Sequence, residues 1–224
     1  MSKTDINGKL VQFAWWALAI IAFTLVVAIR IRLLGIPLER DEGEYAYAGQ
    51  LMLQGIPPYK LAYNMKFPGT YAAYALIMSM FGQTISGIHV GFLLVNAATI
   101  ALVFLLGRRL INEMAGLVAA ASYAVLSLSP TVLGFAAHAT HFVMLPVLGG
   151  MLLLLDQHAR ARFGRLFVSG VLFGLAVVMK QPGIFFSLFA VIYLMTKGIR
   201  SGLRPKEGFV RALVFSGEIG RAHV

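Results

Sequence analysis

The sequence predicts an all-α protein, a bundle of helices that crosses a membrane several times. Hydrophobic residues make up 59% of the chain and charged residues only 12%, and a typical soluble domain carries about twice that share of charge. Residues 10–29 carry no charge, and residues 114–155 contain no Asp, Glu, Lys or Arg. A spanning helix needs about 20 apolar residues, so the second run is long enough for two spans.

The apolar runs give the expected order of helices. The first run is long and leads to no small-residue cleavage site, so we expect a retained helix rather than a cleaved signal. Residues 70–81 are apolar but short for a span. The expected membrane helices cover residues 10–34, 88–106, 115–137, 142–155, 166–179 and 183–195.

The charge balance indicates contact with membrane lipids. A net charge of +10 would suggest nucleic acid as partner of a soluble protein. Here the basic residues lie in the short gaps between apolar runs, as expected of cytoplasmic loops facing anionic lipid, and no nucleic-acid partner is expected. The absence of cysteine excludes disulfides and thiolate chemistry.

The positive-inside rule places Arg108 and Arg109 in the cytoplasm, and then His138, His141 and Lys180 on the outer side. The side of the acidic loop, residues 36–69, depends on residues 70–81. If that segment spans, the loop is cytoplasmic, which charge counting slightly favours. If it dips into the membrane and returns, the loop is outside with Lys180, which we prefer.

The end of the sequence differs from the rest. Residues 218–224 resemble the translation of a sequencing adapter, and residues 209–215 resemble the start of a further helix. We therefore expect residues 1–217 to form the N-terminal part of one membrane module within a longer protein, and we expect residues 218–224 to be an artefact.

The candidate chemistry lies in the loop that follows the first helix. It contains Glu39, Asp41, Glu42 and Glu44, four of the nine acidic residues. Carboxylates near the bilayer edge are costly unless they are paired, hydrated or bound to metal. They form either a solvated helix end or a site in which one carboxylate is a general base and its neighbour orients it or holds a divalent cation.

Two features complete the loop. Residues 43–54 are expected to form an amphipathic helix whose aromatic residues, Tyr45 and Tyr47, suit the membrane interface. Lys66 either binds a phosphate from the side opposite the acids or extends its ammonium to the interface. The expected apolar face of the helix consists of Tyr45, Ala48, Leu51 and Met52.

Three polar residues stand among the later apolar runs. Lys180 precedes Gln181 and Pro182, and the proline breaks the helix, which places Lys180 at a membrane boundary as a phosphate ligand or an ordinary helix-end lysine. His138 and His141 share a face if they are helical. They are structural, bind phosphate or sugar, or begin a metal site.

These motifs resemble the GT-C membrane glycosyltransferases, and most closely glycosyltransferase family 39, with its protein O-mannosyltransferases and aminoarabinose transferases. The motifs are Arg40-Asp41-Glu42-Gly43-Glu44-Tyr45, Lys66-Phe67-Pro68-Gly69 and Met179-Lys180-Gln181-Pro182. The resemblance covers residues 10–196. It implies a GT-C bundle with juxtamembrane helices in the first external loop.

The resemblance also implies an inverting transferase that moves a sugar from a polyprenyl-phosphate donor to a lipid, glycan or protein acceptor. Asp41 matches the essential Asp of the family and Glu42 its partner. Lys66 matches a basic residue near the donor phosphate, and Lys180 matches a Lys at the corresponding helix break. The other candidate substrate-binding residues are Arg40, Tyr45, Tyr63, His138, His141 and Gln181. The expected location is the bacterial inner membrane, with the site on the outer face.

The sequence departs from the family pattern in two places. His138 and His141 stand where many members carry an Asp, and Met65 stands where aminoarabinose transferases carry a Glu that can bind metal. The cofactor is therefore left open. A divalent metal ion is one candidate, with Asp41, Glu42 and His141 as its candidate ligands.

Two other functions compete with glycosyl transfer. A transporter or flippase for a lipid-linked or anionic solute would explain Lys180 and the broken helix, but not the clustered acids beside an amphipathic helix. A non-catalytic membrane scaffold would tolerate charge changes at Asp41, Lys66 and Lys180.

Overall fold

The computed structural model describes residues 3–64, 66–155 and 163–200, and within them all regular structure is helical, as predicted. Met65 and the residues after 200, including the expected artefact at 218–224, lie outside this part of the chain. The elements are α1 (Lys3–Arg32), α2 (Arg40–Leu53), α3 (Gly69–Phe81), α4 (Ile85–Leu110), α5 (Glu113–Leu126), a 3₁₀ turn (Pro130–Val132), α6 (Ala139–Leu155), α7 (Phe163–Met179) and α8 (Gly183–Arg200).

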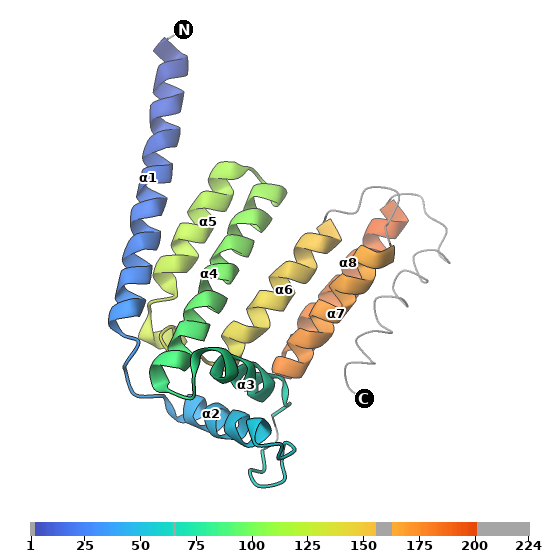
Figure 1. Ribbon diagram of the computed structural model, residues 1–224. Helices are drawn as coiled ribbons and strands as arrows, with labels where there is room; N and C mark the ends of the chain where they lie inside the picture. Colours follow the sequence, from blue (N-terminus) through green and yellow to red (C-terminus); the bar gives the residue numbers. More distant parts are fainter. Residues whose placement is uncertain (1–2, 65, 156–162, 201–224) are drawn as a thin grey trace.

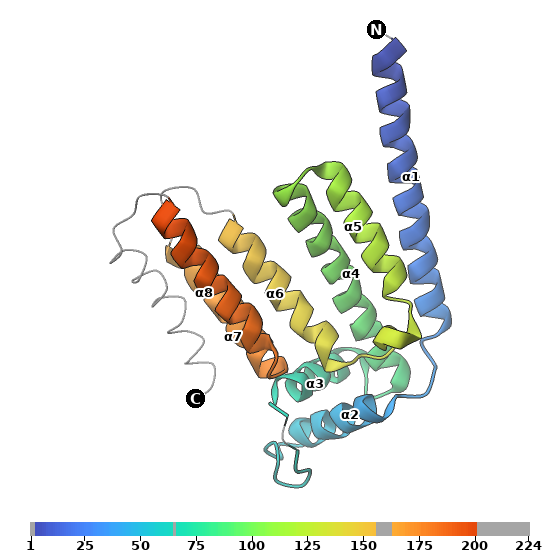
Figure 2. The ribbon, with the colours of Figure 1, turned by 180° about the vertical axis from the view of Figure 1, so that it is seen from behind.

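The long helices run side by side and two short helices lie across one end of them. Figures 1 and 2 show α2 and α3 below α4 and α6, beside the C-terminal end of α1. Helix α4 packs against α5 and α6, α6 packs against α7, and α7 packs against α8. We call the end covered by α2 and α3 the α2–α3 end. The chain returns to it after α5 and again after α7.

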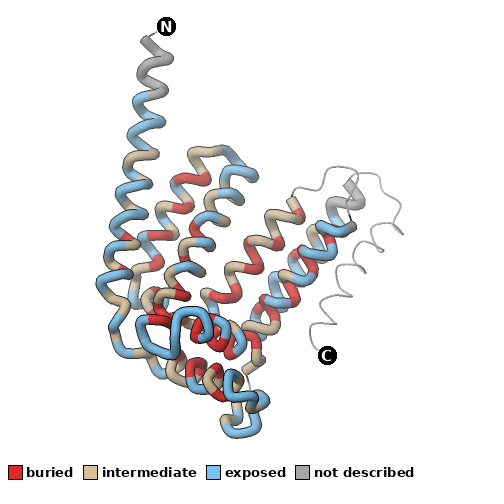
Figure 3. The backbone as a smooth tube through the Cα atoms, viewed as in Figure 1, coloured by how far each residue is buried: buried red, intermediate tan, exposed pale blue. Residues whose placement is uncertain are grey.

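In the described part of the chain, two helices are long and apolar enough to cross a membrane, Leu10–Arg32 and Ile85–Leu110. Further helices there are apolar but shorter. The outward side chains of α1 are largely hydrophobic and exposed, among them Phe13 and Ile21, and Figure 3 shows exposure along most of this helix. Such a surface suits lipid contact, because the hydrocarbon core offers apolar side chains the environment they prefer.

Helix α3 does not run along the bundle. It spans Gly69–Phe81, packs chiefly on α2, and lies with it across the α2–α3 end (Figure 1). The structure therefore agrees with the interpretation in which residues 70–81 dip and return. Consequently Asp41, His138 and Lys180 all lie at one end of the bundle.

An aromatic core holds α2 and α3 onto α4 and α6. Tyr45, Tyr74, Phe92 and Phe142 are buried in one cluster. The Tyr74 hydroxyl donates a hydrogen bond of 2.7 Å to the carbonyl of Ala137, so this buried polar group is satisfied. The burial of Tyr45 contradicts its expected place at the membrane interface. Tyr47 lies two residues further along, about 200° around the helix, and is exposed.

Helix α5 is shorter than predicted: it ends at Leu126 instead of continuing to residue 137. Pro130, which cannot donate a backbone hydrogen bond, begins the 3₁₀ turn that follows. The buried Arg30 of α1 lies at the same place, and its Nη2 donates to the carbonyl oxygens of Ser127 and Gly134, both at 2.8 Å. An internal cation thus binds carbonyls that a continuing helix would have used itself. The following 3₁₀ turn leads the chain back to α6.

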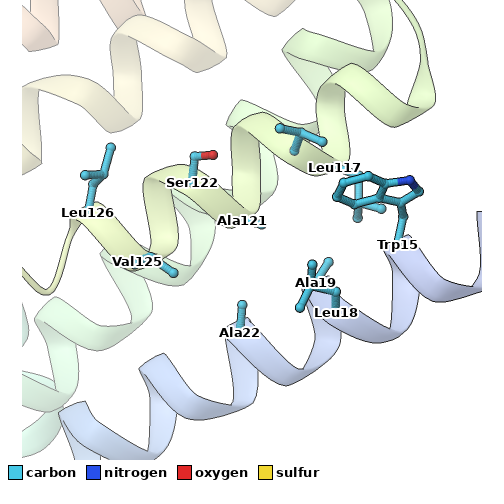
Figure 4. A pocket seen from close by; sticks show the side chains of 10 residues that line it. Trp15, Leu18, Ala19, Ala22, Leu117, Ala121, Ser122, Val125 and Leu126 are labelled. Carbon is cyan, nitrogen blue, oxygen red and sulfur yellow. The ribbon is translucent and has the colours of Figure 1, made fainter.

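A groove of about 510 Å³ lies between α1 and α5. Figure 4 shows small and apolar side chains on both helices lining it, including Ala19, Ala22 and Ala121, with Trp15 at one end. Ser122 is its one polar lining residue. The groove carries no group suited to acid–base chemistry, and its lining suits contact with apolar molecules.

Candidate functional site

The start of α2 fixes the acidic motif in space. Glu39 is the N-cap, and its carboxylate accepts from the backbone N–H of Asp41 at 2.8 Å. In return the Glu42 carboxylate accepts from the backbone N–H of Glu39 at 2.9 Å, which completes a capping box. Asp41 and Glu42 therefore lie in the first helical turn, where the helix dipole favours negative charge.

Asp41 is the centre of a polar cluster at the α2–α3 end. Its Oδ2 lies 3.5 Å from Lys66 Nζ and 3.3 Å from His138 Nε2. Its Oδ1 lies 3.3 Å from Arg40 Nη2. The Asp41 side chain keeps 19% of its surface exposed, so an external molecule can reach it. We call Asp41, Lys66 and His138 the Asp41 cluster.

Lys66 is held by the loop that follows α2. Its Nζ lies 3.1 Å from Glu44 Oε2 and 4.8 Å from the centre of the Tyr45 ring, a cation–π arrangement. The Tyr59 hydroxyl donates to the Lys66 carbonyl at 2.7 Å. The lysine is thus aimed at the acids by backbone and side-chain contacts together.

Glu44 connects three segments of the site through hydrogen bonds. Its Oε1 accepts from Asn64 Nδ2 at 2.7 Å and from the Tyr71 hydroxyl at 3.1 Å. These bonds join α2, the loop before α3 and α3 itself. Glu44 therefore stabilises the position of Lys66 as well as pairing with its charge.

Glu42 is buried, with only 1% of its side chain exposed. Its Oε1 lies 3.3 Å from His89 Nε2 and accepts from the backbone N–H of Ala137 at 2.5 Å. Its Oε2 is bound to Glu39. Burial alone would raise the pKa of Glu42, but these donors outweigh burial and lower it. Both oxygens thus face protein groups, which suits an orienting role.

His89 was not identified from the sequence. Its Nδ1 lies 2.9 Å from the carbonyl oxygen of Leu34, so its ring connects the end of α1 with α2. An ionisable residue inside the apolar run of α4 is the pattern that could have indicated it.

His138 and Lys180 reach the site from two further segments. His138 precedes α6, and its Nδ1 lies 2.9 Å from Thr140 Oγ1. Lys180 follows α7 directly and is half-buried. The Thr70 hydroxyl donates to the Met179 carbonyl at 2.8 Å, which joins the start of α3 to the end of α7. A Cβ on Gly69 would lie 2.6 Å from the Val178 oxygen, so this contact requires glycine.

The condition for a shared helical face is not met, because α6 begins at Ala139 and only His141 lies within it. His141 Nε2 lies 3.3 Å from the Leu133 carbonyl oxygen, and its ring packs on Phe92 with 5.0 Å between centroids. His138 is therefore the histidine in contact with Asp41.

Three other predicted site residues lie around the cluster. Arg40 keeps 90% of its side chain exposed while it contacts Asp41. Tyr63 is 84% exposed in the loop before Lys66. Gln181 is exposed in the turn between α7 and α8. These residues can contact a ligand bound over the cluster but do not build the cluster.

The charges in the Asp41 cluster shift its pKa values. Burial raises the pKa of Asp41, but Lys66 and Arg40 outweigh it and bring the pKa below its usual value. Burial lowers the pKa of Lys66, whereas Glu44, Tyr45 and Asp41 raise it, and the result is above the usual value. Burial and the positive charge of Lys180 lower the pKa of His138, although Asp41 partly opposes them. At neutral pH, Asp41 is therefore ionised and His138 is neutral.

The donor set does not fit a divalent metal ion. Asp41 faces two cationic side chains, Glu42 is bound on both oxygens by protein donors, and His141 lies beside Leu133 and Phe92. Among the described residues there is no group of three or more His, Asp or Glu side chains placed to hold a metal ion.

The fold and the site together define an integral membrane protein with a carboxylate–lysine–histidine cluster at one end of its helices. Residues 66–216 match the model of the dolichyl-phosphate-mannose-protein mannosyltransferase family. No curated protein and no solved structure matches the chain.

Because the match covers more than half of the chain, the chain belongs to this family, and it is a membrane glycosyltransferase of the GT-C type. The matched range contains Lys66, His138 and Lys180, and Asp41 lies before it.

Proposed function

We propose that the protein transfers a sugar from a polyprenyl-phosphate donor to a lipid, glycan or protein acceptor, with inversion at the anomeric carbon. The observation that carries this proposal is the contact of Asp41 Oδ2 with both Lys66 Nζ and His138 Nε2. At this partly exposed contact, the Asp41 carboxylate can accept a proton and the neighbouring nitrogen donors can bind a phosphate.

The proposed reaction is a single displacement. The acceptor hydroxyl attacks the anomeric carbon, and its proton passes to Asp41 as the new carbon–oxygen bond forms. The bond between the anomeric carbon and the phosphate oxygen breaks, and its electron pair remains on the phosphate. Lys66 and Lys180 offset the negative charge that grows there. Attack from the side opposite the leaving group inverts the anomeric centre.

The other residues position these groups. Glu42 holds the backbone of Ala137, the residue before His138, and thereby sets His138 against Asp41. Neutral His138 has one N–H, which faces Asp41 from Nε2, and we expect it to turn to the sugar or the phosphate when the donor binds. Arg40, Tyr63 and Gln181 contact the bound substrates at the rim, and Tyr45 supports Lys66 from below.

The proposed location is the bacterial inner membrane, with the Asp41 cluster on its outer face and α2 and α3 as the juxtamembrane helices of a GT-C bundle. This orientation is supported by Arg108, Arg109 and Arg165, which lie at the opposite ends of α4 and α7. Such an asymmetry of basic residues is typical of the cytoplasmic side.

The test is transfer of radiolabel from a polyprenyl-phosphate sugar in membranes containing the full-length enzyme. Asp41→Asn keeps the size of the side chain but removes the base, so we expect transfer to fall roughly 100-fold or more. Glu113→Gln is the matched control because Glu113 begins α5, at the opposite end. Normal transfer by Asp41→Asn would refute the role of Asp41. Movement of intact donor across the membrane without transfer would favour a flippase.

A further inference from the structure

A second polar cleft lies at the end of the bundle opposite α2 and α3. It has a volume of about 580 Å³ and lies among α4, α6 and α7. Figure 1 shows the C-terminal ends of α4 and α6 and the start of α7 at this end. We call it the arginine cleft, and its lining residues are Leu105, Arg108, Arg109, Leu152, Leu153 and Arg165.

The arginine cleft combines positive charge with an apolar wall. Arg108 and Arg109 come from the last turn of α4, and Arg165 comes from the first turn of α7. The leucines come from α4 and α6, and those of α6 are half-buried. One side of a bound molecule would therefore meet guanidinium groups and the other would meet hydrocarbon.

Helix stability explains only part of this charge. Cations at the C-terminus of α4 are favoured by its dipole, so Arg108 and Arg109 would be stabilising without any ligand. Arg165 stands near the N-terminus of α7, where the dipole disfavours a cation and the first backbone N–H groups favour an anion. The dipole of α7 therefore does not account for a basic residue at this position.

We propose that the arginine cleft binds the phosphate of an anionic membrane lipid. Its place at the ends of membrane helices puts it at the level of lipid headgroups, and basic pockets between such helices favour anionic headgroups. Arginine suits this ligand because its planar group donates two parallel hydrogen bonds to phosphate oxygens. The leucines then contact the upper part of an acyl chain, which a free phosphate ion lacks.

This lipid site is separate from the Asp41 cluster, at the other end of the helices, and does not depend on the proposed transfer reaction. A lipid bound there would connect α4 with α6 and α7. Its expected effect is a more stable arrangement of these helices.

The experiment measures the Tm of the full chain in neutral detergent during titration with short-chain phosphatidylglycerol. Parallel titrations use short-chain phosphatidylcholine, which has no net charge, and inorganic phosphate, which has no acyl chain. The variants are Arg165→Gln and the double variant Arg108→Gln/Arg165→Gln. Lys60→Gln is the matched control, because Lys60 is an exposed cation in the loop at the α2–α3 end.

We expect phosphatidylglycerol to raise the Tm of the wild type along a saturating curve, and the other two compounds to leave it unchanged. Each arginine removed should weaken the apparent affinity roughly five-fold, and the double variant roughly 25-fold. Lys60→Gln should bind like the wild type. If the double variant does not fold without lipid, Arg165→Gln alone decides the comparison.

Three results would overturn the proposal. An equal loss of affinity in Lys60→Gln would indicate diffuse attraction to net charge. The same rise in Tm with inorganic phosphate would indicate a site for free anions. A curve that does not saturate, or is unchanged in Arg165→Gln, would show that the arginine cleft is not where the lipid binds.

Discussion

His89 Nε2 lies 3.3 Å from Glu42 Oε1, and both side chains are almost completely buried. This pair joins α4 to α2, and through Ala137 it reaches the segment that carries His138. A polar contact so far inside an apolar bundle is costly unless it is satisfied. The pair thus links α4 and α2 to the segment that carries His138 in the Asp41 cluster.

Replacing Glu42 by Ala should destabilise the α2–α3 end. The change leaves the backbone N–H groups of Ala137 and Glu39 without their acceptor and removes the carboxylate that faces His89, and a buried donor without a partner costs roughly 1–3 kcal/mol. We expect a loss of at least about 2 kcal/mol in the free energy of unfolding, measured by denaturant titration in a mild detergent. In a double-variant cycle, His89→Ala should add less in the Glu42→Ala background than in the wild type.

Glu113→Ala is the control for that measurement, since Glu113 accepts one bond of 3.2 Å from Trp16 in the middle of α1, away from the α2–α3 end. It should cost about 1 kcal/mol. Equal losses for Glu42→Ala and Glu113→Ala, or full additivity with His89→Ala, would contradict the proposed role of the pair.

Lys66→Met should impair use of the donor. The side chain keeps its length but loses the charge that faces Asp41 and Glu44. A hydrogen bond to a charged group contributes roughly 1.5–3 kcal/mol, so kcat/KM for the donor should fall roughly 10- to 100-fold. Lys66→Arg keeps the positive charge and should therefore retain part of the wild-type kcat/KM. Lys60→Met removes a neighbouring exposed cation and serves as control; a similar loss in both variants would refute a specific phosphate contact.

The sequence predicted the members of the Asp41 cluster better than their contacts. Asp41 and Lys66 were identified because charged residues at the edge of apolar runs are rare and costly. Glu42 could not be distinguished from Asp41 in this way, because adjacent residues on a helix differ only in the direction they face. Its burial depends on His89 and Ala137, which are distant in sequence.

The helix boundaries were predicted where local chemistry alone decides them and missed where a distant residue also takes part. The Pro182 break after α7 needs only the missing backbone N–H of proline, and α8 begins one residue later. The end of α5 has a local signal in Pro130 and a distant contact in Arg30, which reaches Ser127 and Gly134 from α1. Hydropathy alone continues through that region, since an apolar run does not show where its carbonyls find other partners.

The pH dependence of transfer should be controlled by His138 on its acid side. The pKa of Asp41 lies below its usual value of about 3.9, so Asp41 stays ionised far below neutral pH. The pKa of His138 lies below its usual value of about 6.5. In the unfolded chain, His138 binds a proton below about pH 6.5, whereas in the folded protein it does so only at lower pH. Acidification therefore first reduces the free energy of unfolding and then protonates His138 in the folded site.

We therefore expect kcat/KM to be constant near neutrality and to fall at a pH below about 6.5. In His138→Gln this acid limb should disappear or move to the lower pH at which Asp41 is protonated. His141→Gln is the comparison, since His141 bonds to Leu133 instead of Asp41. An acid limb unchanged in His138→Gln but altered in His141→Gln would reverse the assignment.

Gly69→Ala should separate α3 from α7 and thereby move Lys180. The added Cβ would meet the Val178 oxygen at 2.6 Å and the Met179 nitrogen at 2.9 Å, both backbone atoms that cannot move aside alone. Overpacking of this kind costs roughly 1–3 kcal/mol, and both the free energy of unfolding and donor transfer should fall. Gly43→Ala is the matched control, because nothing lies within 4 Å of its new Cβ and alanine within a helix should stabilise α2 by roughly 0.5–1 kcal/mol. If Gly69→Ala proves as stable and as active as Gly43→Ala, the close contact of α3 with α7 is not what holds Lys180 beside His138.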